Sequence, residues 1–243
     1  MTVLQLVLLR HGESEANIAA EEAERTGADR VAVPARDPDV ELSSTGREQA
    51  QAVGPALAGM AEGERPAAVW VSPYRRAQQT AELALVSAGL DLPVRVDERL
   101  RDRELGVLDT LTSHGVERLH PEEAERRRFL GKFYYRPPGG EAWTDVALRV
   151  RSILRDLDDA NDERVLVVCH DAVIMLFRGI CERMAERELL DEARAHPVPN
   201  CSITRLARDA AGEPWRAVTV NDIRHLDPED MTLHAGDPRG TQP

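Results

Sequence analysis

The sequence is poor in cysteine and in aromatic residues. Its 243 residues include three cysteines, Cys169, Cys181 and Cys201, and aromatic side chains make up only 4% of the chain. Because the cysteines form no CxxC pair, they predict neither a disulfide framework nor a zinc site. Three unpaired thiols fit a protein of a reducing compartment.

Long apolar runs and an N-terminal targeting pattern are also missing. No apolar run approaches the ~18 residues that a membrane-spanning helix needs. Residues Met1 to Leu9 carry no basic residue before their apolar stretch, whereas a secretory signal peptide begins with one. We therefore expect a cytoplasmic protein without a membrane partner.

Acidic residues outnumber basic ones, 43 against 31, which gives a net charge of −12. A surface of this sign repels nucleic acid and anionic membranes, so we expect neither as a partner. An anionic ligand would need a local cluster of arginines to overcome that field. The apolar content of 42% excludes a disordered chain, and the length fits one domain with a sizeable core.

Short apolar runs alternate with helical patterns along the chain. The runs at 3–9 and 164–169 are too short for buried helices and predict strands buried on both faces. The full set of expected elements comprises strands at 3–9, 67–71, 94–96 and 164–169, helices at 12–25, 45–60, 72–89, 121–131, 143–157 and 172–194, a long loop at 26–41, and a closing hairpin of 201–206 with 215–220.

Local signals predict where two of these helices begin. Thr45 and Glu48 have the spacing of a capping box, and Ser72 followed by Pro73 predicts an N-cap with proline in the first turn. Alternation of strands with helices predicts an α/β fold, with helices on both faces of a mostly parallel sheet. We expect one domain over 1–224, with 98–140 as a cap or insertion region and 225–243 as a polar surface tail.

Two histidines directly follow the two most apolar strands. His11 comes after the first strand and His170 after the second. In a parallel sheet, ligands bind beyond the carboxyl ends of the strands. Arg10 lies at the same strand end, and an arginine pair, Arg75 and Arg76, lies just past the 67–71 strand. Guanidinium groups near strand ends match phosphate or carboxylate oxygens, so we expect a phosphate site. The residues predicted for this site do not include the carboxylates that usually accompany catalytic magnesium, and the sequence has no GxxxxGK[ST] motif. We therefore expect no metal.

The segment LLRHGESEAN at 8–17 resembles the RHG signature of the histidine phosphatase superfamily, which includes cofactor-dependent phosphoglycerate mutase and fructose-2,6-bisphosphatase. The resemblance continues in the order expected for that family, in segments at 42–50 (LTxxGxxQA), 72–81 (SxxxRAxQTA), 100–106 (LxExxxG), 138–141 (PGGE) and 167–170. An ordered set of this kind, covering about two-thirds of the chain, is far more specific than a single motif.

The resemblance implies a three-layer α/β/α sandwich of the phosphoglycerate mutase type and phosphoryl transfer through a phosphohistidine. His11 would be the nucleophile, and Arg10, Arg76 and His170 would bind the non-bridging phosphate oxygens. Arg76 is preferred to Arg75 because it directly precedes the alanine of the motif.

Further contacts follow from the same resemblance. Asn17 would add a hydrogen bond to the phosphate, and so would the backbone N–H of Asp171. Many members have glycine at the latter position, so the Asp171 carboxylate would disfavour multiply charged ligands unless it points outward. No cofactor is implied, except 2,3-bisphosphoglycerate if the protein is a mutase.

The proton donor has two candidates. Alignment favours Asp102, where most members carry glutamate, and Glu104 lies two residues further on. Either side chain could instead be a solvated loop carboxylate.

Around the substrate, Tyr134, Tyr135 and Arg136 lie where relatives place a covering segment, and Glu141 matches a supporting position near the rim. Arg126, Arg127 and Arg128 fit a solvated helix face better than a second phosphate site. Cys169 fits a small core residue better than a reactive thiol.

The function that we expect is metal-free hydrolysis of a small phosphorylated metabolite. A phosphoglycerate mutase would use the same residues, and a non-catalytic phospholigand-binding protein could share the fold. The oligomeric state stays open, a homodimer included.

Overall fold

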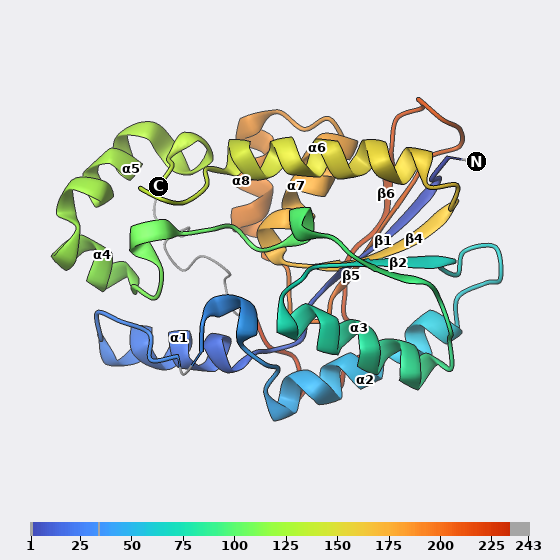
Figure 1. Cartoon of the computed structure of the whole chain (residues 1–243), viewed down its shortest axis with the longest axis horizontal. Helices are drawn as coiled ribbons and strands as arrows, with labels where there is room; N and C mark the ends of the chain where they lie inside the picture. Colours follow the sequence, from blue (N-terminus) through green and yellow to red (C-terminus); the bar gives the residue numbers. More distant parts are fainter. Residues whose placement is uncertain (1, 34, 234–243) are drawn as a thin grey trace.

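The computed structural model describes residues 2–33 and 35–233, and these form an α/β sandwich (Figure 1). Within them the sheet has six strands in the order β3-β2-β4-β1-β5-β6. The strands are β1 (Gln5–Arg10), β2 (Ala68–Val71), β3 (Val94–Val96), β4 (Arg164–Cys169), β5 (Ile203–Ala207) and β6 (Arg216–Asp222). β1, β2, β3 and β4 are mutually parallel, and β5 and β6 close the sheet as an antiparallel pair. The expected mostly parallel sheet and its closing hairpin are confirmed.

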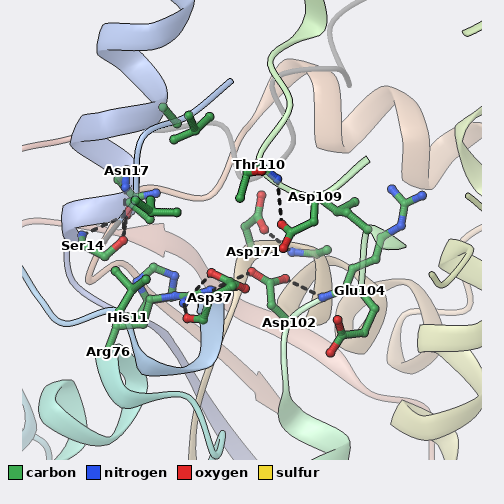
Figure 2. Close-up of a pocket in the computed structure, with 18 of the residues that line it drawn as sticks. His11, Ser14, Asn17, Asp37, Arg76, Asp102, Glu104, Asp109, Thr110 and Asp171 are labelled. Atoms are coloured by element: carbon green, nitrogen blue, oxygen red, sulfur yellow. Dashed lines mark hydrogen bonds and ion pairs between the residues drawn. The ribbon is translucent and has the colours of Figure 1, made fainter. Parts of the chain in front are cut away.

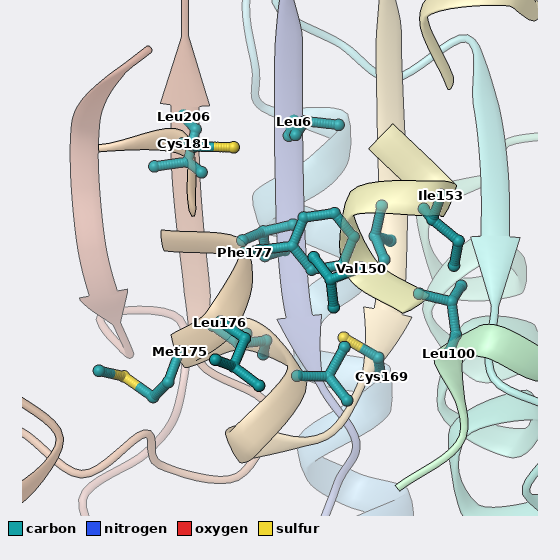
Figure 3. Close-up of a cluster of buried hydrophobic side chains, with 14 of the residues drawn as sticks. Leu6, Leu100, Val150, Ile153, Cys169, Met175, Leu176, Phe177, Cys181 and Leu206 are labelled. Atoms are coloured by element: carbon teal, nitrogen blue, oxygen red, sulfur yellow. The ribbon is translucent and has the colours of Figure 1, made fainter. Parts of the chain in front are cut away.

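The central strands β1 and β4 are buried on both faces. Alternate side chains point to opposite faces of a strand, and accordingly Leu6 and Leu8 belong to one apolar cluster while Val7 and Leu9 belong to the other. Figure 3 shows the first cluster, in which Phe177 and Val150 lie against the sheet. Dense Val and Leu runs are therefore the sequence pattern that this sheet requires.

Helices cover both faces, which completes the three layers (Figure 1). One face carries α2 (Ser44–Ala58) and α3 (Arg75–Ala88), and the other carries α6 (Trp143–Asp159) and α7 (Asp171–Cys181). In α6 the buried side chains recur at helical spacing, so that one face of the helix packs on the sheet. The helix predicted at 143–157 is thus confirmed.

Two predicted helix starts were wrong. The N-cap of α2 is Ser43, whose hydroxyl accepts a hydrogen bond from the N–H of Gly46, so Thr45 and Glu48 do not form the cap. The other helix, α3, begins at Arg75 with Tyr74 as its N-cap, and Ser72 lies before it, where its hydroxyl bonds to His170 and accepts from the N–H of Tyr74.

The single helix predicted at 172–194 was also wrong. It is split into α7 and α8 (Glu186–Ala195), and Arg183 between them has a φ of 57°. A left-handed residue cannot continue an α-helix, so the chain turns there.

Residues 98–140 contain more regular structure than expected. They form α4 (Ser113–Leu119), α5 (Pro121–Tyr134) and two 3-10 turns, η2 (Glu98–Leu100) and η3 (Gly106–Leu108), and Gly131 interrupts α5 with a φ of 76°. The segment after α1 (Glu15–Thr26) is held against this region, because Arg30 and Leu111 form an isolated β-bridge. That segment, expected as a loop, contains the 3-10 turn η1 (Asp37–Asp39).

The C-terminal segment only partly matches the expected surface tail. Leu226 is buried in the apolar cluster beneath α2 and α3, and Gln49 donates to the backbone oxygen of Asp230. Residues 234–243 lie outside the described part of the chain. Among the helices of the described residues, none has the length and apolar character that crossing a membrane requires.

Candidate active site

A pocket of about 170 Å³ opens at the carboxyl ends of β1 and β4. Figure 2 shows its side chains arriving from the sheet edge, from α1 and from the loops on either side. Charged and polar lining residues include Arg10, His11, Ser14, Asn17, Asp37, Arg76, Asp102, Arg103, Glu104, Asp109, Thr110, Lys132 and Asp171. The apolar ones are Ala16, Ala20, Val31, Val33, Val40, Leu105, Leu111, Trp143 and Ala172.

His11 and His170 lie side by side because β1 and β4 are neighbours in register, with Arg10 opposite Cys169. Their ring centroids are 5.1 Å apart in an edge-to-face arrangement. Nδ1 of His11 lies 2.7 Å from the carbonyl oxygen of Gly12. A carbonyl oxygen only accepts, so Nδ1 carries the proton and the lone pair of the neutral ring resides on Nε2.

The second ring, His170, is completely buried. Its Nε2 lies 2.8 Å from the hydroxyl of Ser72. Nδ1 lies 3.3 Å from Oδ2 of Asp102, but the geometry makes no hydrogen bond between them. Among the described residues Nδ1 is a buried polar atom without a hydrogen-bond partner, and His170 lies behind His11 and Asp102 and does not itself line the pocket.

Both imidazoles are held in the neutral form. Burial, followed by the nearby Arg76 guanidinium, lowers the pKa of His11 well below its ordinary value. Burial and then Arg76 likewise lower the pKa of His170. A neutral imidazole has the lone pair that a nucleophile needs.

Arg10 and Arg76 contribute the positive charge at this end of the pocket. Arg10 is 1% exposed and donates through Nη1 to the carbonyl oxygen of Val198, while its buried Nε has no hydrogen-bond partner among the described residues. Arg76 is also buried, whereas Arg75 is exposed and lies 3.3 Å from Glu41 outside the pocket. The structure thus brings Arg76 into the pocket and leaves Arg75 at the surface.

Asp37 is a pocket residue that the sequence did not single out. It accepts from Nη1 of Arg76 at two atoms, its carbonyl oxygen at 2.7 Å and Oδ1 at 2.9 Å. Burial raises the pKa of Asp37, and the Arg76 charge opposes that effect. Nothing in the polar 26–41 segment distinguishes Asp37 from its neighbour Asp39, so only the folded loop reveals it.

The two proton-donor candidates occupy different surroundings. Asp102 lies next to His170 and places Oδ2 3.4 Å from Nη2 of Arg76. Glu104 accepts from the hydroxyl of Tyr74 at 3.1 Å, and its side chain is about half exposed at 48%. Asp102 is therefore the carboxylate that borders both the histidine pair and the arginine.

Asn17 and Asp171 also line the pocket. Oδ1 of Asn17 accepts from the N–H and the hydroxyl of Ser14 and so caps α1, which leaves Nδ2 as its group for a ligand. Asp171 begins α7, and its Oδ1 accepts from the N–H of Ala172. Its carboxylate faces the pocket rather than pointing outward (Figure 2), and burial raises its pKa.

Of the residues expected at the substrate rim, Glu104 lines this pocket, and Tyr134, Tyr135, Arg136 and Glu141 do not. Tyr135 is buried and donates to Glu123, because its ring fills the small apolar cluster formed within residues 98–140. Tyr134 is exposed, and Arg136 is paired with Asp145 at the surface. Glu141 lies behind the pocket wall, where it accepts from Arg101 and Arg149 and from the N–H of Glu104.

The arginine run on α5 also stays outside the pocket lining. Arg126 pairs with Glu123, and Arg128 pairs with Glu117. Two cations that were not predicted line the pocket instead, Arg103 and Lys132. Arg103 donates to the carbonyl oxygens of Glu141 and Tyr135, and Lys132 lies 4.8 Å from the ring centre of Trp143. Cys169 is a buried core residue, and burial raises its pKa.

Several residues of the sequence motifs lie outside the pocket and connect the elements that carry its side chains. Gly12 donates through its N–H to the hydroxyl of Thr80, and that hydroxyl donates to the carbonyl oxygen of Arg76. Gln49 accepts from the N–H of Glu13, which follows the nucleophile segment. A Cβ on Gly12 would collide with the carbonyl oxygen of Gly46, so the two motif glycines pack backbone against backbone. These contacts tie the ends of β1, α2 and α3 together.

The chain matches the family model of the histidine phosphatase superfamily (branch 1) over residues 6–223. It is 30% identical over 174 residues to a 6-phosphofructo-2-kinase/fructose-2,6-bisphosphatase of Gallus gallus and 31% identical over 174 residues to one of Homo sapiens. These alignments cover 72% of this chain but only 32% of each relative, so the match spans about a third of those proteins.

Solved structures of other proteins share the fold of this chain. A mycobacterial glucosyl-3-phosphoglycerate phosphatase superposes with a TM-score of 0.70 at 27% identity, covering 90% of this chain and 98% of the other. The fold is also that of a protein described as a putative alpha-ribazole-5'-P phosphatase from Escherichia coli, with a TM-score of 0.74 at 21% identity, covering 91% of this chain and 97% of the other. The fold, the paired histidines at adjacent strand ends and the family match agree, and the chain belongs to the histidine phosphatase superfamily, branch 1.

Proposed function

We propose that this protein hydrolyses phosphate monoesters of small metabolites, without a metal, through a phosphohistidine on Nε2 of His11. One observation carries the proposal: Nδ1 of His11 is bonded to the Gly12 carbonyl oxygen, so that the lone pair of Nε2 is available in a pocket that the buried guanidinium groups of Arg10 and Arg76 also line. A neutral imidazole is a competent nucleophile toward phosphorus, and the neighbouring guanidinium groups stabilise the charge that spreads over the phosphoryl oxygens.

In the first step Nε2 of His11 attacks phosphorus, and the bond from phosphorus to the alcohol oxygen breaks. Arg10, Arg76 and His170 hold the non-bridging oxygens. Asp102, next to His170, gives its proton to the departing alcohol oxygen. In the second step Asp102 takes a proton from water, the water oxygen attacks phosphorus, and the P–N bond breaks to release inorganic phosphate.

The charges around the pocket favour a hydrolase over a mutase. A mutase must hold a second anionic group of a bisphosphorylated intermediate. Here Asp37, Asp109 and Asp171 line the pocket, and its two remaining cations, Arg103 and Lys132, already contact protein groups. A substrate with one phosphate and no second anion meets less repulsion there. Replacement of Asp171 by glycine should therefore improve turnover of doubly phosphorylated relative to singly phosphorylated substrates.

A substrate panel of sugar phosphates, phosphoglycerates, nucleotides and phosphoproteins, assayed with and without a chelator, tests the proposal. The panel includes glucosyl-3-phosphoglycerate, the compound in the name of the mycobacterial relative. We expect release of inorganic phosphate that the chelator does not reduce, together with a phosphohistidine that the His11→Ala variant cannot form. Loss of activity with the chelator would contradict the metal-free mechanism.

Two competing functions would give different experimental results. Isomerisation of 3-phosphoglycerate in the presence of 2,3-bisphosphoglycerate, faster than hydrolysis of p-nitrophenyl phosphate, would identify a mutase. Phospholigand binding that survives in His11→Ala, with no turnover of any phosphomonoester by the native chain, would identify a binding protein on the same fold.

A further inference from the structure

The Arg76 guanidinium already has a protein anion bound to it. Nη1 donates to the carbonyl oxygen and Oδ1 of Asp37, and Nη2 lies 3.4 Å from both Oδ2 of Asp37 and Oδ2 of Asp102. Each terminal nitrogen of an arginine carries two hydrogens, and those of Nη1 are both directed at Asp37. A phosphate can therefore reach Nη1 only by replacing Asp37 (Figure 2).

The segment that carries Asp37 also builds part of the pocket wall. Val31, Val33 and Val40 line the pocket on either side of Asp37 in the sequence, and Val31 is held by a hydrogen bond from its N–H to the carbonyl oxygen of Thr110. The 3-10 turn η1 places Asp37 on Arg76. The same segment thus presents an anion to the arginine and an apolar surface to the rest of the ligand.

We propose that Asp37 is a positioning residue that competes with phosphate for Arg76 and so weakens the binding of the inorganic phosphate that hydrolysis leaves in the pocket. The inference rests on the proposed function, because it assigns the monoester as substrate and inorganic phosphate as product. Both ligands must displace the carboxylate from Arg76. The alcohol part of a monoester would lie against Val31, Val33 and Val40, which line the pocket, and this burial would offset the cost, whereas inorganic phosphate has no apolar part to bury.

The competition also has a kinetic consequence. After hydrolysis the alcohol has left, and the remaining phosphate has no contact with the apolar wall. The carboxylate of Asp37 can then return to Arg76 and expel the product. Asp37 would act through Arg76 and not on the reacting atoms, so we describe it as a positioning residue for product release.

The variant that tests this is Asp37→Asn, with Asp39→Asn as its matched control. Both remove one negative charge from the same 3-10 turn, but Asp39 pairs with the exposed Arg36 and does not line the pocket. We expect inorganic phosphate to bind about tenfold more tightly to Asp37→Asn, a conservative value for removing an anion from a buried guanidinium. Its affinity for Asp39→Asn should stay within about twofold of the native value. Isothermal titration calorimetry with inorganic phosphate measures both without any turnover.

A double-mutant cycle separates competition from a structural effect. In the Arg76→Gln background, Asp37→Asn should no longer tighten phosphate binding, because the guanidinium for which the two anions compete is gone. During turnover, product inhibition by phosphate should be about tenfold stronger in Asp37→Asn than in Asp39→Asn. The melting temperature of each variant shows whether it is folded. A second substitution, Asp37→Ser, provides another variant without the carboxylate in case Asp37→Asn does not fold.

Weaker or unchanged phosphate binding by folded Asp37→Asn and Asp37→Ser would overturn the inference. So would tightening of equal size in Asp39→Asn or in the Arg76→Gln background. These outcomes are independent of the proposed function, which fails instead if the native chain forms no phosphohistidine and releases no phosphate from any monoester.

Discussion

The two ends of the pocket are built differently. The inner end consists of His11, Arg10 and His170, which are buried at the ends of adjacent parallel strands, together with Arg76 at the start of α3. The outer end consists of side chains from the 27–41 segment and the cap region 98–140, with apolar residues and carboxylates mixed. Under the proposed function, the inner end would bind the phosphate through its arginines, and the outer end would contact the alcohol part of the substrate.

This difference assigns the reaction and the selection of substrates to two different sets of residues. Side chains at strand ends are fixed by the ladder of the sheet, so their geometry does not depend on the loops. Loop residues can change without disturbing the sheet, and they set which ligands fit. Substitutions at the inner end should thus reduce turnover of every phosphate monoester, and substitutions at the outer end should change their ranking.

The largest expected effect comes from the adjacent arginines at the start of α3. Arg76→Gln should lower kcat/KM by about 10²–10³ for every phosphate monoester, since it removes a buried donor to the phosphoryl oxygens. Arg75→Gln should change it by less than about twofold, because Arg75 is exposed and paired with Glu41. Steady-state kinetics on both variants measures this difference, and equal losses would show that Arg76 has no special role.

The next effect distinguishes the two candidate acids. Asp102→Asn should lower kcat for alkyl phosphates by about 10²-fold, because their alcohols leave poorly without a proton. The loss should be much smaller with p-nitrophenyl phosphate, whose leaving group needs no proton. Glu104→Gln should have little effect on either substrate. If Glu104→Gln shows the leaving-group dependence instead, the assignment of Asp102 is wrong.

A smaller effect should come from the contact that joins the two outer segments. Asp29 accepts from the N–H of Thr112 and pairs with Arg118, and a Cβ on Gly115 would collide with its carbonyl oxygen. Gly115→Ala should destabilise the fold by about 1–3 kcal/mol. It should also raise KM more than it lowers kcat. Thermal unfolding and kinetics test both parts, and a fall in kcat with unchanged KM would contradict the separation of the two ends.

The smallest effect concerns pH and stability at the inner end. The pKa of His170 in the folded chain lies well below its ordinary value, so below about pH 6.5 the unfolded chain binds a proton that the folded chain excludes. Stability from this residue is therefore present above pH 6.5 and falls as the pH decreases. His170→Asn should make the loss of unfolding free energy between pH 6.5 and 5 shallower by up to about 1.4 kcal/mol per pH unit. Urea unfolding at pH 7, 6 and 5 tests this, and parallel curves for the two proteins would refute it.

Much of the inner end could be predicted from the sequence, because its residues stand at recognisable strand ends. The dense apolar runs identify β1 and β4, and the residues that follow them, His11 and His170, must then meet. The outer end could not be predicted in this way. Tyr135 was expected at the substrate rim but fills a small core, and Asp37 reaches Arg76 only because its loop folds back across α3. Contacts made by irregular segments depend on the whole fold, and no local periodicity encodes them.

The backbone contact between Gly12 and Gly46 has a consequence for a position that does not line the pocket. Gly46 lies in the first turn of α2, outside the pocket lining, yet a methyl group there would push against the backbone oxygen of Glu13. The displaced segment is the one that aims the imidazole of His11. A side chain at position 46 should therefore lower turnover, although the residues that line the mouth of the pocket keep their positions.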